Sequence, residues 1–174
     1  MFFNKKNKRF SQYYNEFFEK IYNYIFFRVG NNRQMAEEFT QEVFLKAYEN
    51  FDDFDKNANF SAWIYRIAHN HIIDHYRKKK TNTTDLDAIV NMINYSKHAD
   101  ETFVKNTDIK IEMKNVLKAL ESLNDQQKNL IILRYIEEYE IEEIAEIVKE
   151  SANYVRVNLH RALQKLNSIL TDFK

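Results

Sequence analysis

The 174-residue chain contains no cysteine, no proline and a single glycine, Gly30. Without cysteine, disulfides and thiolate zinc sites are excluded. Because β-sheet proteins usually need more glycine in their turns, the composition favours an all-helical protein whose loops are built from Asn, Asp and Ser. No apolar run reaches about 18 residues, so we expect no membrane insertion. The basic N-terminus lacks the apolar stretch of a signal peptide, so we expect a cytoplasmic location.

Charges of the two signs are equal in number, with 26 basic and 26 acidic residues, but they are sorted along the chain. Residues 37–55 carry seven acids against Lys46, and residues 66–80 carry five bases against Asp74. Residues 137–150 are acidic again. Such alternation is typical of a protein that binds both a nucleic acid and a basic protein partner, although ordinary solvated helix faces are an alternative explanation.

Apolar residues recur at the helical period over residues 11–29, 33–50 and 60–79, which predicts three helices. Gly30 stands where a left-handed helix C-cap is expected, and Asn31 or Asn32 can cap the next helix. The segment from Phe51 to Asn59 breaks the period and predicts a loop. Residues 81–108 show no clear periodicity, so we interpret them as a linker, flexible or weakly helical.

Shorter helices are expected in the last third of the chain. One ends near Ser122, one is opened by Asn124 as its N-cap, one spans about residues 141–148, and one follows Ser151. The turn at residues 149–151 predicts a helix-turn-helix motif, although two helices of an ordinary bundle would have the same pattern. If the apolar stripe of the last helix faces inward, its DNA-contacting side chains are Tyr154, Arg156, Asn158, Arg161 and Lys165.

The central segment FSAWIYRIAHNHIIDHYRKKK combines aromatic residues with a basic end, which predicts a platform for single-stranded nucleic acid. Packing of Phe60 and Trp63 in the core is the alternative. His71 and His75 have a spacing that could bind a metal, but the sequence has no HExxH pattern and no further ligand cluster. We therefore expect no metal, no cofactor, no small-molecule substrate and no enzymatic activity.

These segments together resemble the extracytoplasmic-function (ECF) group of the sigma-70 family of RNA polymerase sigma factors. AEEFTQEVFLKAYENFDDF resembles the family's region 2.2, and FSAWIYRIAHNHIIDHYRKK resembles regions 2.3 and 2.4. LNDQQKNLIILRYIEEYEIEEIAEIV resembles the first part of region 4, and SANYVRVNLHRALQKL resembles its recognition helix. The resemblance implies a region 2 domain at residues 1–80, a linker at 81–108 and a region 4 domain at 109–174.

The resemblance implies a subunit that directs core RNA polymerase to promoters; a stand-alone helix-turn-helix regulator is the alternative. The side chains that it places on the clamp helices of the largest polymerase subunit are Glu37, Glu38, Gln41, Glu42 and Phe44. Those that it places on the −10 element, with the Phe51–Asn59 loop, are Phe54, Phe60, Trp63, Arg66, Asn70, Arg77 and Lys78. The polymerase flap and an anti-sigma protein are further implied partners.

The resemblance also assigns the last helix to the −35 element, through Arg156, Asn158 and Arg161. In the turn before that helix, Lys149 occupies a position where the family usually has glycine, and Glu150 replaces an apolar residue. The turn is therefore expected to be looser than in other members of the family or differently packed.

Overall fold

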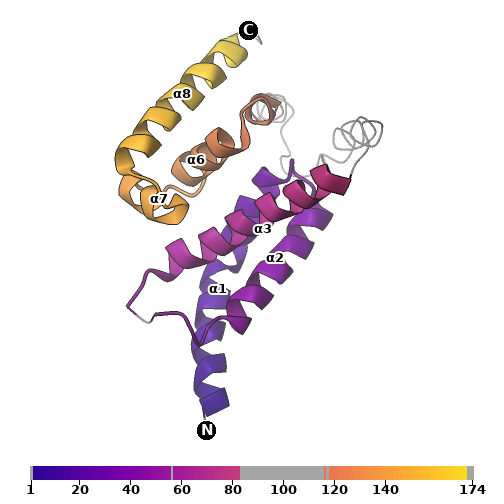
Figure 1. Cartoon of the computed structure of the whole chain (residues 1–174), viewed down its shortest axis with the longest axis vertical. Coiled ribbons are helices and arrows are strands. Elements are labelled where there is room, and N and C mark those ends of the chain that lie inside the picture. The colour runs from indigo at the N-terminus through magenta and orange to yellow at the C-terminus, as the bar shows by residue number, and fades with distance from the viewer. Residues whose placement is uncertain (1, 56, 83–115, 117, 172–174) are drawn as a thin grey trace, which may run out of the picture. The chain divides into compact units, whose positions relative to one another are not determined.

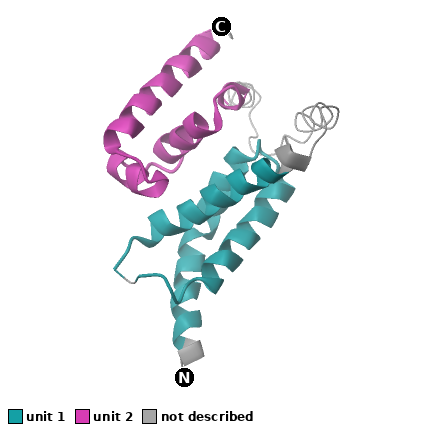
Figure 2. Ribbon diagram, viewed as in Figure 1, with its two compact units in different colours: residues 1–97 teal, residues 98–174 magenta. Residues whose placement is uncertain are grey.

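The computed structural model describes residues 2–55, 57–82, 116 and 118–171. Every secondary-structure element in these ranges is a helix, as the composition predicted. The chain divides into two compact units, residues 1–97 and 98–174 (Figure 2). Most of the predicted linker, residues 81–108, lies outside the described residues; its first two residues, Thr81 and Asn82, continue a helix.

Unit 1 is built from α1 (Phe2–Arg28), α2 (Arg33–Glu49) and α3 (Phe60–Asn82), and each of these helices contacts the other two (Figure 1). Their buried stripes meet in a core that includes Ile21, Tyr24, Ile25, Phe39, Val43, Ala47, Ile64, Tyr65, Ala68 and Ile72. The start of α1 differs from the expected start near Ser11. Phe10 is buried in the core, so the packed stripe of α1 begins earlier than the sequence pattern indicated.

The connection between α1 and α2 uses the residues that the sequence singled out. Gly30 has a φ of 68° and Asn31 a φ of 61°, so the left-handed cap extends over two positions. Asn32 then caps α2, since its Oδ1 accepts a hydrogen bond of 3.0 Å from the backbone N–H of Met35. This tight reversal lets α2 return against α1.

Unit 2 contains a helical turn at residues 118–121, then α6 (Asp125–Tyr135), α7 (Ile141–Val148) and α8 (Ala152–Thr171). Asn124 caps α6 as predicted, with its Oδ1 accepting a 2.8 Å hydrogen bond from the N–H of Gln127. The core of the unit comprises Leu130, Ile132, Leu133, Ile144, Ile147, Val155, Leu159 and Ala162. Helices α6 and α7 both pack on α8. Within the described residues, no helix is both long and apolar enough to cross a bilayer.

The turn between α7 and α8 is closed by hydrogen bonds on both sides of Lys149. Lys149 adopts the left-handed conformation with φ 57° and ψ 43°, although a non-glycine residue pays about 1–2 kcal/mol for it. The N–H of Glu150 donates to the carbonyl of Ala145 at 3.1 Å, and Ser151 Oγ accepts from the N–H of Tyr154 at 3.1 Å. The helix-turn-helix therefore forms without the glycine.

Candidate nucleic-acid and polymerase interfaces

The exposed face of α2 is acidic. Its solvent-exposed side chains include Glu37, Glu38, Gln41, Glu42 and Glu49. Leu45 lies on this same face, one helical turn after Gln41 and two turns after Glu38. Leu45 is 57 % exposed, so it places an apolar side chain among these polar ones. The sequence analysis missed Leu45, although its position outside the apolar stripe was a usable signal. We call the side chains of residues 38, 41, 42 and 45 the acidic face.

Phe44, which the resemblance placed on the polymerase, lies one turn after Gln41 at the edge of this face and is buried. Its ring contacts Tyr14 edge to face at a centroid distance of 4.8 Å, and it also lies near Phe10 and Phe18. In this position Phe44 anchors α2 to α1. The exposed side chains beside it are the ones that can reach a partner.

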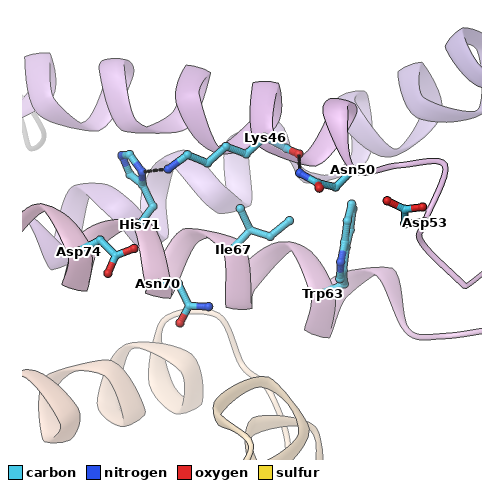
Figure 3. A pocket seen from close by; sticks show the side chains of 8 residues that line it. All are labelled: Lys46, Asn50, Asp53, Trp63, Ile67, Asn70, His71 and Asp74. Atoms are coloured by element: carbon cyan, nitrogen blue, oxygen red, sulfur yellow. Dashed lines mark hydrogen bonds between the residues drawn. The ribbon is translucent and has the colours of Figure 1, made fainter.

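A cavity of about 450 Å³ opens between α2, α3 and the loop that joins them (Figure 3). The residues that line it are Lys46, Asn50, Asp53, Trp63, Ile67, Asn70, His71 and Asp74. The lining combines an indole with amide, carboxylate and ammonium groups. An unstacked nucleobase is recognised by this chemistry, because its face stacks on aromatic rings and its edge hydrogen-bonds to polar groups.

Histidine 71 forms one wall of this cavity. Lys46 Nζ lies 2.7 Å from His71 Nδ1, and because an ammonium group only donates, His71 carries its proton on Nε2 (Figure 3). That Nε2 lies 3.3 Å from Glu42 Oε2, close enough for attraction but without hydrogen-bond geometry. Burial lowers the pKa of His71, and the charge of Lys46 lowers it further. The ring is therefore neutral at neutral pH and ties α3 to α2.

The histidines do not form a metal site in the part of the chain that the structure describes. No group of three His, Asp or Glu side chains there has the geometry to hold an ion. The rings of His71 and His75 instead pack against Phe39, at centroid distances of 4.7 and 4.8 Å. Their spacing thus reflects packing on one helix face.

The aromatic residues predicted for single-strand binding separate into buried and accessible ones. Phe54 and Phe60 are 6 % and 5 % exposed, and Phe60 stacks on Tyr13 at 3.9 Å. Tyr65 is fully buried against Tyr24. These rings offer no free face to a base. Trp63 is half-buried: its ring packs 4.7 Å from that of Phe54, and it also lines the cavity.

Polar side chains continue along the same side of α3. Asn70 is exposed two turns after Trp63, and Arg77 is exposed two turns after Asn70. Arg77 forms an ion pair of 2.9 Å with Asp74, and Arg66 is half-buried. Lys78 is exposed near the end of the described side chains. The structure thus brings Trp63, Asn70 and Arg77 onto one face.

The side chains predicted for duplex reading on α8 are not equally accessible. Arg161 and Lys165 are exposed, whereas Tyr154 and Asn158 are half-buried. Lys165 Nζ donates to the carbonyl of Ser122 at 2.6 Å. Arg156 also has a partner, because its Nη2 donates to Glu142 Oε1 on α7 at 2.7 Å.

Helical geometry places Arg156 on a different flank of α8 from Asn158 and Arg161, at about 100° per residue. The side opposite the buried stripe holds Val157, which is 39 % exposed. The sequence analysis did not include Val157 among the contact residues, although the same helical period indicates its position. An apolar side chain there could contact the methyl group of thymine in a major groove.

In comparisons with known proteins, each of the two units matches a protein-family model. Residues 11–81 match sigma-70 region 2, and residues 113–166 match sigma-70 region 4. The chain is 36 % identical to the ECF RNA polymerase sigma factor SigW of Bacillus subtilis over 160 residues, covering 88 % of this chain and 84 % of SigW. It is 29 % identical over 159 residues to the RNA polymerase sigma factor YlaC of the same organism, covering 91 % of this chain and 90 % of YlaC.

Among solved structures, the sigma factor RpoE from Bartonella quintana, crystallised with the anti-sigma factor NepR, has a similar fold. Its TM-score is 0.77 at 21 % identity, with 94 % of this chain and 98 % of RpoE covered. The fold, the two ordered family matches and the similarity to SigW agree. The chain belongs to the sigma-70 family and is an RNA polymerase sigma factor of the ECF group.

Proposed function

We propose that this sigma factor divides promoter recognition among three surfaces. The acidic face of α2 binds core polymerase, the cavity and the adjoining face of α3 hold the unpaired −10 strand, and α8 reads the −35 duplex. The observation that carries the proposal is the cavity lined by Trp63 and Asn70 in the same helical unit as a face of carboxylates. The carboxylates of α2 repel a polyanion, whereas the cavity offers an indole ring and amide groups to an uncharged base.

The acidic face suits a basic helical partner such as the clamp helices of the largest polymerase subunit. Glu38, Gln41 and Glu42 supply charge and hydrogen bonds, while Leu45 supplies an apolar contact among them. Burial of this exposed apolar side chain against a partner would add to the binding free energy. Phe44 supports this surface from the core. The sequence provides no separate observation for the polymerase flap, which stays a proposed partner.

The cavity suits a base that has left the duplex stack. Trp63 can stack on the base, which contributes about 1–3 kcal/mol for each stacked base. Asn50 and Asn70 can pair with its edge, and both line the cavity. Arg77 and Lys78 are exposed along α3, where they can neutralise phosphates. Phe54 and Phe60 hold Trp63 and the loop in place.

On the duplex side, Arg161 is the best-placed side chain of α8 for a base edge or phosphate, since it is exposed. One well-made bidentate contact is worth about 1–3 kcal/mol of discrimination. Arg156 would exchange its ion pair with Glu142 for a phosphate. Tyr154, Asn158 and Lys165 contribute from the flank of the helix.

The stand-alone regulator is less well supported, because it would need only α7 and α8 and would leave the region 2 match without a role. We assign the chain no catalytic activity, since it belongs to a family of initiation factors. We expect it to act in the cytoplasm, where polymerase and promoters are. An anti-sigma protein is a further proposed partner, because RpoE, which has the same fold, was crystallised with one.

Promoter opening tests the assignment of the cavity. Trp63→Ala and Asn70→Ala should reduce permanganate reactivity of the −10 thymines while binding of the closed promoter by the holoenzyme stays near the wild-type level. Ile73→Ala is the matched control, because Ile73 is 38 % exposed on α3 but does not line the cavity. Wild-type permanganate reactivity in both cavity variants would refute the assignment.

A further inference from the structure

The first turns of α1 carry a cluster of positive charge that precedes the region 2 match, which begins at residue 11. Residues 1–15 contain four cations, Lys5, Lys6, Lys8 and Arg9, and no acid. We call residues 5–9 the basic turn. The helix is continuous from Phe2, so these cations project from a defined element.

The basic turn is attached to the connection between α2 and α3 (Figure 1). Lys6 Nζ pairs with Asp52 Oδ2 at 2.6 Å and lies 4.7 Å from the ring centroid of Tyr48. The hydroxyl of Tyr48 donates to Asn7 Oδ1 at 2.8 Å. The Arg9 guanidinium lies 5.4 Å from the ring centroid of Phe51. These contacts fix the turn beside the loop whose Asp53 lines the cavity.

The negative charge of the loop between α2 and α3 repels the phosphates of DNA. Residues 51–59 carry Asp52, Asp53 and Asp55 against Lys56, a net charge of minus two. With the four cations of the basic turn beside it, the combined segment has a net charge of plus two. Lys5 and Lys8 are exposed, and neither forms an ion pair with any described side chain. Their charge is therefore available to a ligand.

We propose that the basic turn binds phosphates of the promoter strand that enters the cavity, offsetting the acidic loop beside it. This inference rests on the proposed function of the cavity. DNA is favoured over an anionic lipid surface because membrane-bound helices insert an apolar side into the bilayer. Phe10, which directly follows the basic turn, is not available for insertion, because it is buried with its ring centroid 5.2 Å from those of Tyr48 and Phe51.

The test compares holoenzymes binding a forked promoter fragment that is single-stranded through its −10 element, at several salt concentrations. Each phosphate contact to a single strand contributes about 0.7 to the slope of log affinity against log salt. Lys5→Gln combined with Lys8→Gln should therefore lower the magnitude of that slope by about 1.4 and weaken binding at low salt. Lys20→Gln, an exposed cation two-thirds of the way along α1, should leave both unchanged.

A second variant separates charge from loop positioning. Asp52→Asn breaks the ion pair with Lys6 but removes a negative charge, so charge compensation predicts equal or tighter DNA binding. Weaker binding by Asp52→Asn, as large as that of the double lysine variant, would show that the turn only holds the loop.

An unchanged salt slope in the double lysine variant would also overturn the inference. If that variant in addition lost binding to phosphatidylglycerol vesicles, the basic turn would be assigned to lipid. Failure of the proposed function would give a different result from failure of this inference. In that case the wild-type holoenzyme itself would bind the fragment no better than core polymerase does.

Discussion

Leucine 45 offers a measurable test of the polymerase-binding surface. Complete burial of a leucine side chain is worth about 1.5–3 kcal/mol. Because the side chain is 57 % exposed in the free protein, only that share can still be gained on binding. Leu45→Ala should therefore cost about 1 kcal/mol of binding free energy, or about a fivefold rise in the Kd for core polymerase. Thermal stability should fall by less than for a fully buried leucine, because less than half of this residue is covered within the chain.

The assay is a titration of fluorescently labelled sigma factor with core polymerase, in the absence of DNA. Leu163→Ala is the matched control, since Leu163 is also partly exposed, at 39 %, but lies on α8. Phe44→Ala should behave differently from both. It removes a buried ring, costs about 3–5 kcal/mol of folding stability, and would lower binding through unfolding. An unchanged Kd for Leu45→Ala with a folded protein would refute the reasoning about the acidic face.

Two further predictions concern stability. The pKa of His71 is lower in the folded protein than in the unfolded chain, where it is about 6.5. As the pH falls, the unfolded chain therefore takes up this proton first. The neutral ring contributes its full stabilisation above about pH 6.5, and this stabilisation is lost as the pH falls through the pKa of the folded state. In the His71→Gln variant, the free energy of unfolding, measured by urea titration, should decrease less between pH 7 and pH 5 than in the wild type. An equally large decrease in the variant would contradict this. Lys149→Gly relieves a left-handed non-glycine residue and should raise the free energy of unfolding of unit 2 by about 0.5–1 kcal/mol. A fall in that free energy, monitored by hydrogen exchange of α7 and α8 amides, would show that the lysine side chain stabilises the turn.

The helices were predictable because their buried positions repeat at the helical period. The caps were predictable from residue chemistry, because Gly30 has no Cβ to oppose a positive φ, and Asn32 and Asn124 have side-chain oxygens that accept from backbone N–H groups. The beginning of α1 was missed because Asn, Lys and Arg dominate its first turns, and the nearest apolar residues before Phe10, Phe2 and Phe3, are seven or more positions away. Apolar residues so far apart do not define a helical period.

The candidate site was harder to predict, because composition does not distinguish a stacking platform from a core. Phe54, Phe60 and Trp63 have the same character in the sequence, and only packing shows that Trp63 alone of these lines a cavity. The ion pair between Arg156 and Glu142 likewise depends on how α7 crosses α8. The exposed positions of Leu45 and Val157 follow from the helical period, but an apolar side chain on a polar face does not by itself indicate binding.

The most direct test of whether the chain directs core polymerase to promoters is run-off transcription from a library of genomic promoter fragments. It compares core polymerase alone with core polymerase to which the purified chain has been added. The account predicts specific transcripts that depend on the chain and that weaken with Trp63→Ala. Core polymerase that starts at no promoter with the folded chain present would contradict it.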